Sequence, residues 1–343
     1  MKTLLTIIPV LFISWSCTTP AAEDYIDFIN IGDHVWAITV DSSVVKFDLK
    51  GKQGIKKVFD DSIKVTVIAK DRNDNIVVVD AMNRIGKYEA GKWRFANTGQ
   101  SNITAIFYTS SNKEYLVTDS GIINTESNKT YFPDSALIAQ MGRYYGMMEY
   151  TSALLDNRDN IWLGYNYGEW GGNIFIFNTA ENRFIHPSTR NMNLEEYPIF
   201  SLAQGPDGIY FSGGLSHMKI TMGYIAKFRD STAFVVFHNQ YHEENKKRKV
   251  HYVGPIAYNK WDSYLYFYSQ YGFFKAKVDS ELWNEAYWTS LANPDLPFTY
   301  GQSMAVGYGM NIKKIVATGP DAVLFLTENR LIGYLVGKEV KLY

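Results

Sequence analysis

The hydrophobic side chains of residues 154–184 fall into four short runs that are separated by polar and glycine-containing turns. Runs of this length between Asn, Asp and Gly residues are typical of β-strands, so the segment predicts one four-stranded antiparallel meander. In the second run, residues 161–164, consecutive side chains are apolar, which places apolar groups on both faces of that strand. Because both faces must then be covered, the pattern predicts further copies of this small sheet on either side.

Similar units recur along the whole chain at intervals of 39 to 58 residues, measured between the starts of their second strands. Small sheets that repeat every ~40–50 residues are typical of a β-propeller, whose blades surround a central channel. We therefore expect an all-β fold, a seven-bladed β-propeller of four-stranded antiparallel blades, in which the last residues of the chain form a fourth strand. The second strands are expected to begin at Val35, Ile76, Tyr115, Ile161, Ile209, Leu265 and Val323.

The motif Asp-x-x-Asp-Asn-Ile-Trp-Leu-Gly at residues 156–164 resembles the repeat of the two-component regulator propellers, the extracytoplasmic sensor domains of bacterial hybrid histidine kinases. A weaker match covers residues 71–79, and the other units agree with that repeat in spacing. Tyr165 stands where the repeat usually has Thr, and the sequence contains no kinase domain. The resemblance therefore implies a sensor-type propeller and an extracytoplasmic location, and it implies no catalytic residue.

The N-terminal segment has the features of a secretion leader. A lysine near the start precedes an apolar run at residues 4–13 that is too short to span a bilayer. The Ser-Trp-Ser-Cys sequence that ends at Cys17 resembles a bacterial lipobox, which implies that Cys17 carries a lipid. Ordinary cleavage near Ala21 or Ala22 is the alternative.

Two regions follow from this assignment. Residues 1–22 form the leader and tether, and residues 23–343 form the propeller. We expect a protein of the cell envelope that is anchored by lipid, in the outer membrane; a secreted or periplasmic soluble protein is the alternative. No later stretch has the apolar length of a membrane helix, so contact with the membrane is expected through the lipid anchor only.

Composition narrows the classes of partner and the nature of the core. The 34 basic and 35 acidic residues give a formal net charge of −1, which argues against nucleic-acid binding. The chain has one cysteine, so the propeller is expected to contain no disulfide. Aromatic residues make up 15% of the chain, and most are expected to fill the ~10 Å gap between stacked sheets.

Long connections are expected on one face of the ring. In a ring of meanders, the connection from the second to the third strand and the connection between blades share a face. Long loops on a rigid scaffold often carry binding residues, so this face, over blades four to seven, is the predicted location of any site. The long connections are expected at residues 133–150, 165–173, 185–197, 213–223, 238–249 and 289–301.

The predicted loops on this face interleave aromatic rings, carboxylates and a cation. Tyrosine and tryptophan offer a rigid apolar plate with a hydrogen-bonding tip, which suits a glycan or a peptide. The alternative is that these rings fold down and plug the ring of blades. The candidate ligand-binding residues are Arg143, Tyr144, Tyr145, Glu149, Tyr165, Tyr167, Glu169, Trp170 and His217.

The same loops contain few catalytic candidates. Glu149 and Glu169 could form an acid–base pair only if their carboxyl groups came within ~5–9.5 Å of each other, and the sequence does not place them. The chain lacks a phosphate-binding glycine loop, a nucleophile elbow and a zinc-protease helix motif. We expect a binding protein, with an enzyme as a weaker alternative, and we expect no cofactor.

Metal binding is also not expected. His238, His242 and His251 flank a basic run at residues 246–249 that lacks helical periodicity, which indicates a solvated charged loop. The turn at residues 71–75 lacks the spacing of a calcium loop and is interpreted as an Asx-type turn.

Three functions remain open at this stage. The first is an extracytoplasmic ligand-binding or sensor-like propeller that binds a glycan or peptide. The second is a scaffold subunit that binds another protein of a cell-envelope complex, and the third is a propeller-fold polysaccharide lyase or hydrolase. A widely reused fold does not decide among them, and the sequence leaves the oligomeric state open.

Overall fold

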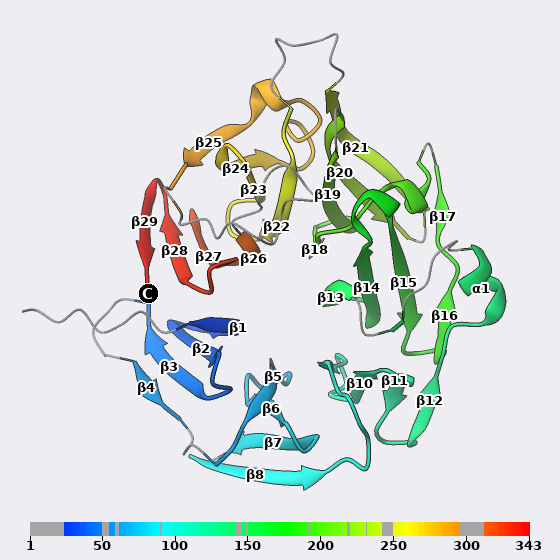
Figure 1. Ribbon diagram of the computed structural model, residues 1–343, viewed down its shortest axis with the longest axis vertical. Coiled ribbons are helices and arrows are strands. Elements are labelled where there is room, and N and C mark those ends of the chain that lie inside the picture. The colour runs from blue at the N-terminus through cyan, green and yellow to red at the C-terminus, as the bar shows by residue number, and fades with distance from the viewer. Residues whose placement is uncertain are drawn as a thin grey trace, which may run out of the picture.

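The protein is a ring of seven antiparallel sheets stacked side by side around a central axis (Figure 1). The computed structural model describes residues 24–49, 55–58, 62–89, 91–140, 146–147, 150–190, 192–217, 220–230, 232–241, 250–294, 296 and 312–343. Six sheets have four strands, and the fifth blade has a fifth strand because β17 adds in parallel to β21. The predicted seven-bladed β-propeller of four-stranded blades is confirmed.

Each blade is built from consecutive strands. Blade 1 contains β1 (Tyr25–Ile31), β2 (His34–Thr39), β3 (Val44–Asp48) and β4 (Lys56–Lys57). Blade 2 contains β5 (Val65–Lys70), β6 (Ile76–Asp80), β7 (Arg84–Glu89) and β8 (Lys92–Asn97). Blade 3 contains β9 (Ala105–Tyr108), β10 (Glu114–Thr118), β11 (Gly121–Asn124) and β12 (Lys129–Tyr131), and a short helix, α1 (Ser135–Gln140), follows it.

The later blades have longer strands. Blade 4 contains β13 (Tyr150–Leu155), β14 (Asn160–Asn166), β15 (Gly172–Asn178) and β16 (Arg183–Ile185). Blade 5 contains β18 (Ser201–Gln204), β19 (Ile209–His217), β20 (Ile220–Arg229) and β21 (Thr232–Tyr241), with β17 (Ser188–Thr189) at its edge. Blade 6 contains β22 (Val253–Asn259), β23 (Tyr264–Ser269), β24 (Gly272–Lys277) and β25 (Thr289–Ala292). Blade 7 contains β26 (Ile312–Gly319), β27 (Ala322–Thr327), β28 (Ile332–Val336) and β29 (Glu339–Leu342).

The core lies between neighbouring blades, as the two-sided apolar pattern predicts. On β14, Ile161 and Leu163 pack with Tyr115 of blade 3, while Trp162 between them packs with Phe211 of blade 5. Alternate side chains of one strand thus enter two different cores. Every second strand begins within one residue of the position expected from the sequence.

The ring closes by contact between blade 1 and blade 7, and no described strand is exchanged between them. The backbone N–H of Tyr25 donates to the carbonyl of Arg330 at 2.6 Å. Phe28 and Leu324 lie in one buried cluster that joins the two blades. The end of the chain forms β29, which confirms the predicted fourth strand.

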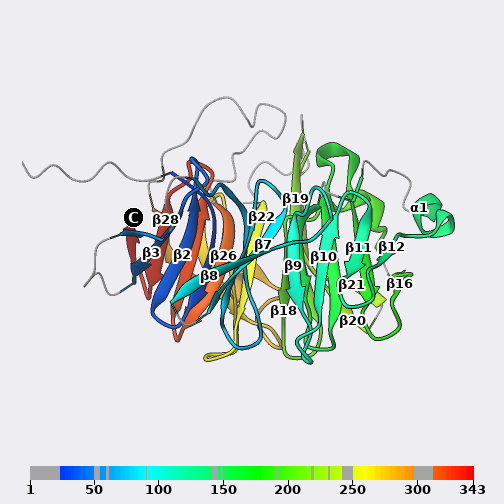
Figure 2. The same ribbon diagram turned by 90° about the horizontal axis from the view of Figure 1, so that it is seen from below.

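The two faces of the ring differ in their connections. We call the side with the strand 2–3 and blade-to-blade connections the long-loop rim, and the side with the strand 1–2 and strand 3–4 turns the short-turn rim. The hairpin β19–β20 projects beyond the other blades at the long-loop rim (Figure 2). In the described part of the chain, no helix is long and apolar enough to cross a membrane.

The structure corrects two of the expected connections and adds one that was not expected. Residues 213–223 were expected to form a loop but mostly extend β19 and β20, which remain paired as far as His217 and Ile220. The expected loop at residues 289–301 begins as strand β25. A further long connection, residues 278–288, follows β24 and so starts from the short-turn side, which means that long connections are not confined to one face.

Packing explains why residues 278–288 depart from a simple turn. Leu282 and Trp288 are buried in the core between blades 5 and 6. Glu285 accepts a hydrogen bond of 3.0 Å from the side-chain amide of Asn239 in blade 5. The segment therefore fills the outer gap between these blades, while Trp283 remains 56% exposed on its surface.

Candidate functional site

The structure describes some of the predicted ligand-binding residues and not others. Tyr165, Tyr167, Glu169 and Trp170 lie in or next to the connection between β14 and β15. His217 ends β19, and its side chain is outside the described part of the structure. The predicted residues that lie outside the described ranges are Arg143, Tyr144, Tyr145, Glu149 and Cys17.

Tyr165 has a packing position. Its ring is fully buried in the core between blades 3 and 4, and its hydroxyl donates to the carbonyl of Met147 at 3.1 Å. The reason is that β14 continues to Asn166, so Tyr165 is a strand residue that faces blade 3. The half-buried ring of Tyr167 lies 6.0 Å from that of Tyr165 and packs against the same core. These two tyrosines thus attach the β14–β15 connection to the core between blades 3 and 4.

Glu169 and Trp170 are presented to solvent by a fixed turn. They lie in a short 3-10 helix, η1 (Gly168–Trp170), whose first N–H donates to the side chain of Asn166 at 2.8 Å. Gly168 and Gly171 have φ values of +63° and +84°, which side chains rarely adopt, so glycine is needed at both ends of the turn. Trp170 is 54% exposed. The turn also contacts β19, so it lies beside the projecting hairpin.

The histidines considered as a metal site are not brought together in the described residues. His251 is buried and its Nδ1 lies 3.1 Å from the hydroxyl of Ser269, with the ring of Trp288 at 4.9 Å. His238 is half-buried against Tyr197, and burial lowers its pKa. His242 lies outside the described ranges. Within those ranges, no group of three or more His, Cys, Asp or Glu side chains is arranged to hold a metal ion.

A central channel of about 940 Å³ runs along the first strands of the blades. Its lining extends from Tyr150 and Phe200 at the long-loop end to Gly205 and Trp261 at the short-turn end. Burial in the channel wall raises the pKa of Tyr150 to about 12, so this phenol stays protonated at neutral pH. The channel is larger than the two cavities described next, and of the three cavities it is the one to which every blade contributes lining residues.

A second cavity, of about 620 Å³, lies between blades 4 and 5 at the short-turn rim. Trp162 and Phe228 form part of its apolar lining. At its edge, Nη1 of Arg158 lies 2.8 Å from the carboxylate of Asp230, and both side chains are exposed. A third, of about 470 Å³, lies between blades 2 and 3.

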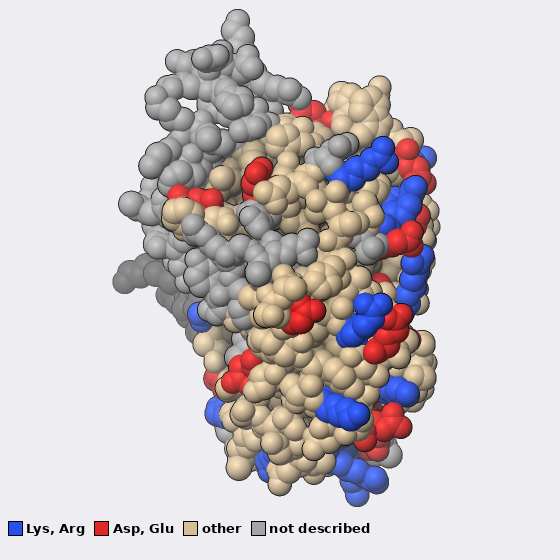
Figure 3. All heavy atoms as spheres, turned by 90° about the vertical axis from the view of Figure 1, so that its right-hand side faces the viewer, with Lys and Arg blue, Asp and Glu red and all other residues tan. Residues whose placement is uncertain are grey.

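Charged side chains gather along the short-turn rim. In Figure 3 basic and acidic residues alternate along the right-hand edge, on the side opposite the projecting hairpin. In blade 5, burial favours a higher pKa for the carboxyl of Asp207, but the hydrogen bonds and positive charge of Lys227 and Arg229 outweigh it and lower the pKa. The pairing keeps Asp207 ionised next to two cations. Positive and negative side chains are therefore paired on this part of the rim.

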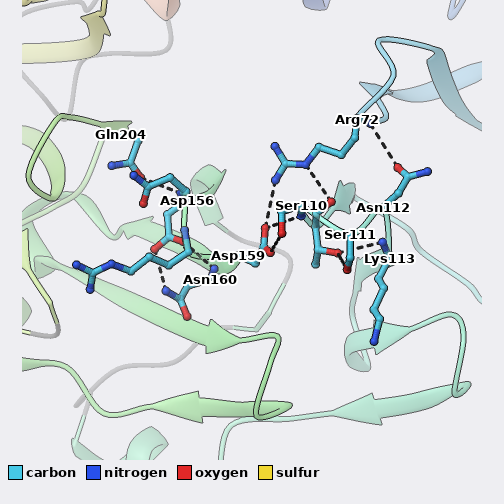
Figure 4. A network of polar contacts seen from close by, with 12 residues as sticks. Arg72, Ser110, Ser111, Asn112, Lys113, Asp156, Asp159, Asn160 and Gln204 are labelled. Atoms are coloured by element: carbon cyan, nitrogen blue, oxygen red, sulfur yellow. Dashed lines mark hydrogen bonds and ion pairs between the residues drawn. The ribbon is translucent and has the colours of Figure 1, made fainter.

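The Asp-x-x-Asp-Asn turns on this rim have the expected Asx geometry. Asp156 accepts from the backbone N–H groups of Arg158 and Asn160 at 2.8 and 2.7 Å. Asp71 accepts from Asn73 and Asn75 in the same way, at 2.8 and 2.9 Å. Figure 4 shows Asp156 in this turn, close to the polar contacts that Asp159 makes with its neighbours. The predicted turn chemistry is confirmed.

Trp261 is a surface residue that the sequence analysis did not single out. It lies in the β22–β23 turn, is 50% exposed and lines the short-turn end of the channel. It lies outside the long connections expected from the sequence, because this turn is short. A tryptophan between Asn259 and Asp262, in an otherwise polar turn, is the signal that could have drawn attention to it.

No protein-family model matches the chain, and no curated protein matches it either. Among solved structures it is similar to the extracellular domain of a putative hybrid two-component system protein of B. thetaiotaomicron, with 12% identity and a TM-score of 0.54 over 94% of this chain and 38% of that one. It is also similar to PorZ, a surface component of the type-IX secretion system of Porphyromonas gingivalis, with 11% identity and a TM-score of 0.53 over 94% and 38% of the two chains.

A third similar structure is the Dos1 propeller, with 8% identity and a TM-score of 0.50 over 93% of this chain and 82% of that one. This chain spans 38% of the length of each of the first two proteins. At such identities the likeness shows the fold alone: the chain is a β-propeller whose structural neighbours include the extracellular domain of a putative hybrid two-component system protein and a secretion-system component.

Proposed function

We propose that this chain is an extracytoplasmic, sensor-like β-propeller that binds a glycan or a peptide at its long-loop rim, over blades 4 to 7. The observation that supports the proposal is the exposure of Trp170 on a turn that hydrogen bonds and glycines hold in place. An indole is a rigid apolar plate with one hydrogen-bond donor, and fixing it before a ligand arrives lowers the entropic cost of binding.

The surroundings of Trp170 supply further features of a recognition surface. The exposed carboxylate of Glu169 lies next to it in sequence and provides an acceptor for hydroxyl or amide groups. The projecting β19–β20 hairpin lies beside the same turn. A flat or extended ligand could lie on the indole with the hairpin as a wall.

The location in the cell envelope is part of the same proposal. The leader-like sequence at residues 4–13 and the lipobox-like sequence that ends at Cys17 support export and lipid attachment. The resemblance of residues 156–164 to the two-component regulator propeller repeat supports a sensor-type role. Incorporation of a labelled fatty acid by the wild-type chain, and its loss in Cys17→Ala, is the direct test of the anchor.

Binding is tested with purified, folded protein on glycan and peptide arrays, followed by titration of each hit. Trp170→Ala is expected to weaken binding at least about tenfold, equivalent to ~1.4 kcal/mol. Trp283→Ala is the matched control, because Trp283 is equally exposed at 56% but lies on the outer flank between blades 5 and 6. A hit whose affinity is unchanged by Trp170→Ala would contradict the proposed location.

A further inference from the structure

The short-turn mouth of the central channel combines an exposed aromatic ring with an unmatched positive charge. We propose that this mouth binds an acidic oligosaccharide, with Trp261 packing against a sugar ring and Lys260 pairing with a sugar carboxylate. The site is separate from the long-loop rim, because Lys260 and Trp261 belong to the β22–β23 turn at the opposite end of the channel.

The turn that carries Trp261 is held rigidly by a fully buried asparagine. The side-chain oxygen of Asn259 accepts from the N–H of Trp261 at 3.1 Å. Its amide nitrogen donates to the carbonyl of Gly319 in blade 7 at 2.8 Å. The following Asp262 accepts from the hydroxyl of Tyr266 at 2.6 Å. The backbone of the turn is therefore held in place and presents a half-exposed indole at the channel mouth, which is the arrangement expected of a preformed binding plate.

The channel lining has more cations than anions. It contains the three lysines Lys260, Lys313 and Lys314 and a single carboxylate, Asp27. Lys314 pairs with Asp27 at 2.7 Å, and Lys313 pairs with Glu328 at 3.2 Å. Among the residues that the structure describes, Lys260 has no carboxylate within ion-pair distance, and its ammonium lies 5.0 Å from the centre of the Trp261 ring.

The charge and the exposed ring at the channel mouth together indicate which ligand it binds. An ammonium that has no carboxylate partner among the described residues, at the solvent-exposed mouth of the channel, attracts an anionic group. The nearby carboxylates do not satisfy it, because Asp262 is bonded to Tyr266 and Asp321 pairs with Lys275. A pyranose ring has an apolar face that packs on an indole, and a uronic acid carries a carboxylate on the same ring.

The channel wall offers partners for the remaining sugar hydroxyl groups. Thr151 and Ser152 on β13 and Ser201 on β18 line it, and hydroxyl side chains can donate and accept. The side chain of Gln204 lies at the short-turn end of the same wall. A chain of acidic sugars entering from the short-turn rim would therefore meet hydrogen-bonding groups beyond Trp261.

The proposal is tested by calorimetric titration of the full chain with oligogalacturonate and with its methyl ester, which keeps the rings but removes the charge. The acid form is expected to bind the wild-type protein about tenfold more tightly than the ester. Lys260→Gln is expected to abolish this difference without weakening the ester, and Trp261→Ala to weaken both forms about tenfold. Added salt should weaken the acid form in the wild type and have little effect in Lys260→Gln.

Two substitutions provide matched controls. Trp283→Ala removes an indole of similar exposure that does not line the channel. Lys341→Gln removes a lysine that also lies over an aromatic ring, at 4.5 Å from the centre of Tyr343, but on the outer strand β29. Neither is expected to change either affinity. Because Trp261 and Lys260 are exposed, Trp261→Ala and Lys260→Gln should keep the wild-type thermal transition. If Trp261→Ala does not keep it, Trp261→Phe is a more conservative replacement.

Three results would overturn the proposal. The first is equal affinity of the wild-type protein for the acid and the ester. The second is a loss of affinity in Trp283→Ala as large as that in Trp261→Ala. The third is the absence of binding by either form at concentrations up to ~1 mM.

Discussion

The guanidinium of Arg72 lies 3.2 Å from the carboxylate of Asp159, although 87 residues separate them in the chain. Arg72 belongs to the β5–β6 turn of blade 2 and Asp159 to the β13–β14 turn of blade 4. Between them, Ser110 of blade 3 donates its backbone N–H and its hydroxyl to the same carboxylate, at 2.7 and 2.5 Å (Figure 4). One side chain thus connects three consecutive blades.

We expect Asp159→Asn to lower the free energy of unfolding by about 1–2 kcal/mol, because hydrogen bonds to a charged group are stronger than those to a neutral one. Asparagine tolerates the left-handed backbone of this residue, φ +62°, so the substitution tests the charge alone. Denaturant unfolding monitored by tryptophan fluorescence gives the value.

Asp230→Asn is the matched control for this measurement. Asp230 also has a left-handed backbone, φ +57°, and also pairs with an arginine of another blade. Its side chain is 72% exposed, whereas that of Asp159 is 20% exposed. Exposed ion pairs contribute at most about 1 kcal/mol, so the loss should be smaller than for Asp159→Asn. Equal losses in the free energy of unfolding would show that the three-blade contact stabilises the protein no more than an exposed ion pair does.

The acid stability of blade 1 should depend on Asp41. The hydroxyl of Thr39 donates to this carboxylate, and so do the hydroxyl and backbone N–H of Ser43. These bonds favour the charged form and lower the pKa of Asp41 from 3.8 to about 2. The unfolded chain therefore takes up this proton at a higher pH than the folded chain, and the stabilisation is present above pH ~4 and lost as the pH falls towards 2.

Thermal unfolding of the wild type and of Asp41→Asn between pH 2 and pH 7 tests this expectation. The wild type should melt at a higher temperature than the variant near neutral pH, and the difference should shrink as the pH falls through the window between about 4 and 2. A difference that stays constant across the whole range would mean that the carboxylate charge does not stabilise the folded turn.

The projecting hairpin should not tolerate a side chain at Gly223. A Cβ atom there would lie 1.7 Å from the carbonyl oxygen of His251, so alanine must push blade 6 away from the hairpin. We expect Gly223→Ala to lower the free energy of unfolding by about 1–3 kcal/mol. Gly319→Ala is the control, because its Cβ would meet nothing closer than 4.0 Å and its φ lies outside the left-handed region that favours glycine. Similar stabilities of the two variants in denaturant unfolding would contradict the close approach.

The fold was predictable because strands with apolar residues at consecutive positions recur along the chain. Ile161, Trp162 and Leu163 are apolar at consecutive positions, and each lies in a core between blades. The hairpin was not predictable from its apolar residues. Residues 213–223 are rich in glycine and polar groups and so resemble a loop, yet those glycines allow the backbones of neighbouring segments to approach two long strands.

The candidate site was predictable only in part. The exposed turn with Glu169 and Trp170 lies at the rim where it was expected. Tyr165 was expected to begin a loop of aromatic and polar residues. It is buried instead, because β14 extends one residue beyond it. Trp261 lies in a short turn, and its proposed role depends on the channel beside it, which is formed by strands distant in sequence. Local patterns do not contain that information.

The last strand should be essential for closing the ring. β29 pairs with β28 from Val336↔Glu339 to Gly333↔Leu342. Beyond it, the hydroxyl of Tyr343 donates to the carbonyl of Leu49 in blade 1 at 2.9 Å, and its ring lies 5.0 Å from that of Phe47. Deleting residues 338–343 removes an entire strand together with a contact between the first and last blades. We expect the deleted chain to lose its cooperative thermal transition.

Circular dichroism on heating, with size-exclusion chromatography of the same sample, measures the effect of the deletion. Tyr343→Phe is the control, since it keeps the ring contact with Phe47 and removes only the hydrogen bond to Leu49, which contributes about 1 kcal/mol. That variant should melt cooperatively at a slightly lower temperature. If the deleted chain instead melts like the parent, the ring must hold through the Tyr25–Arg330 backbone bond and the Phe28–Leu324 core without its outermost strand.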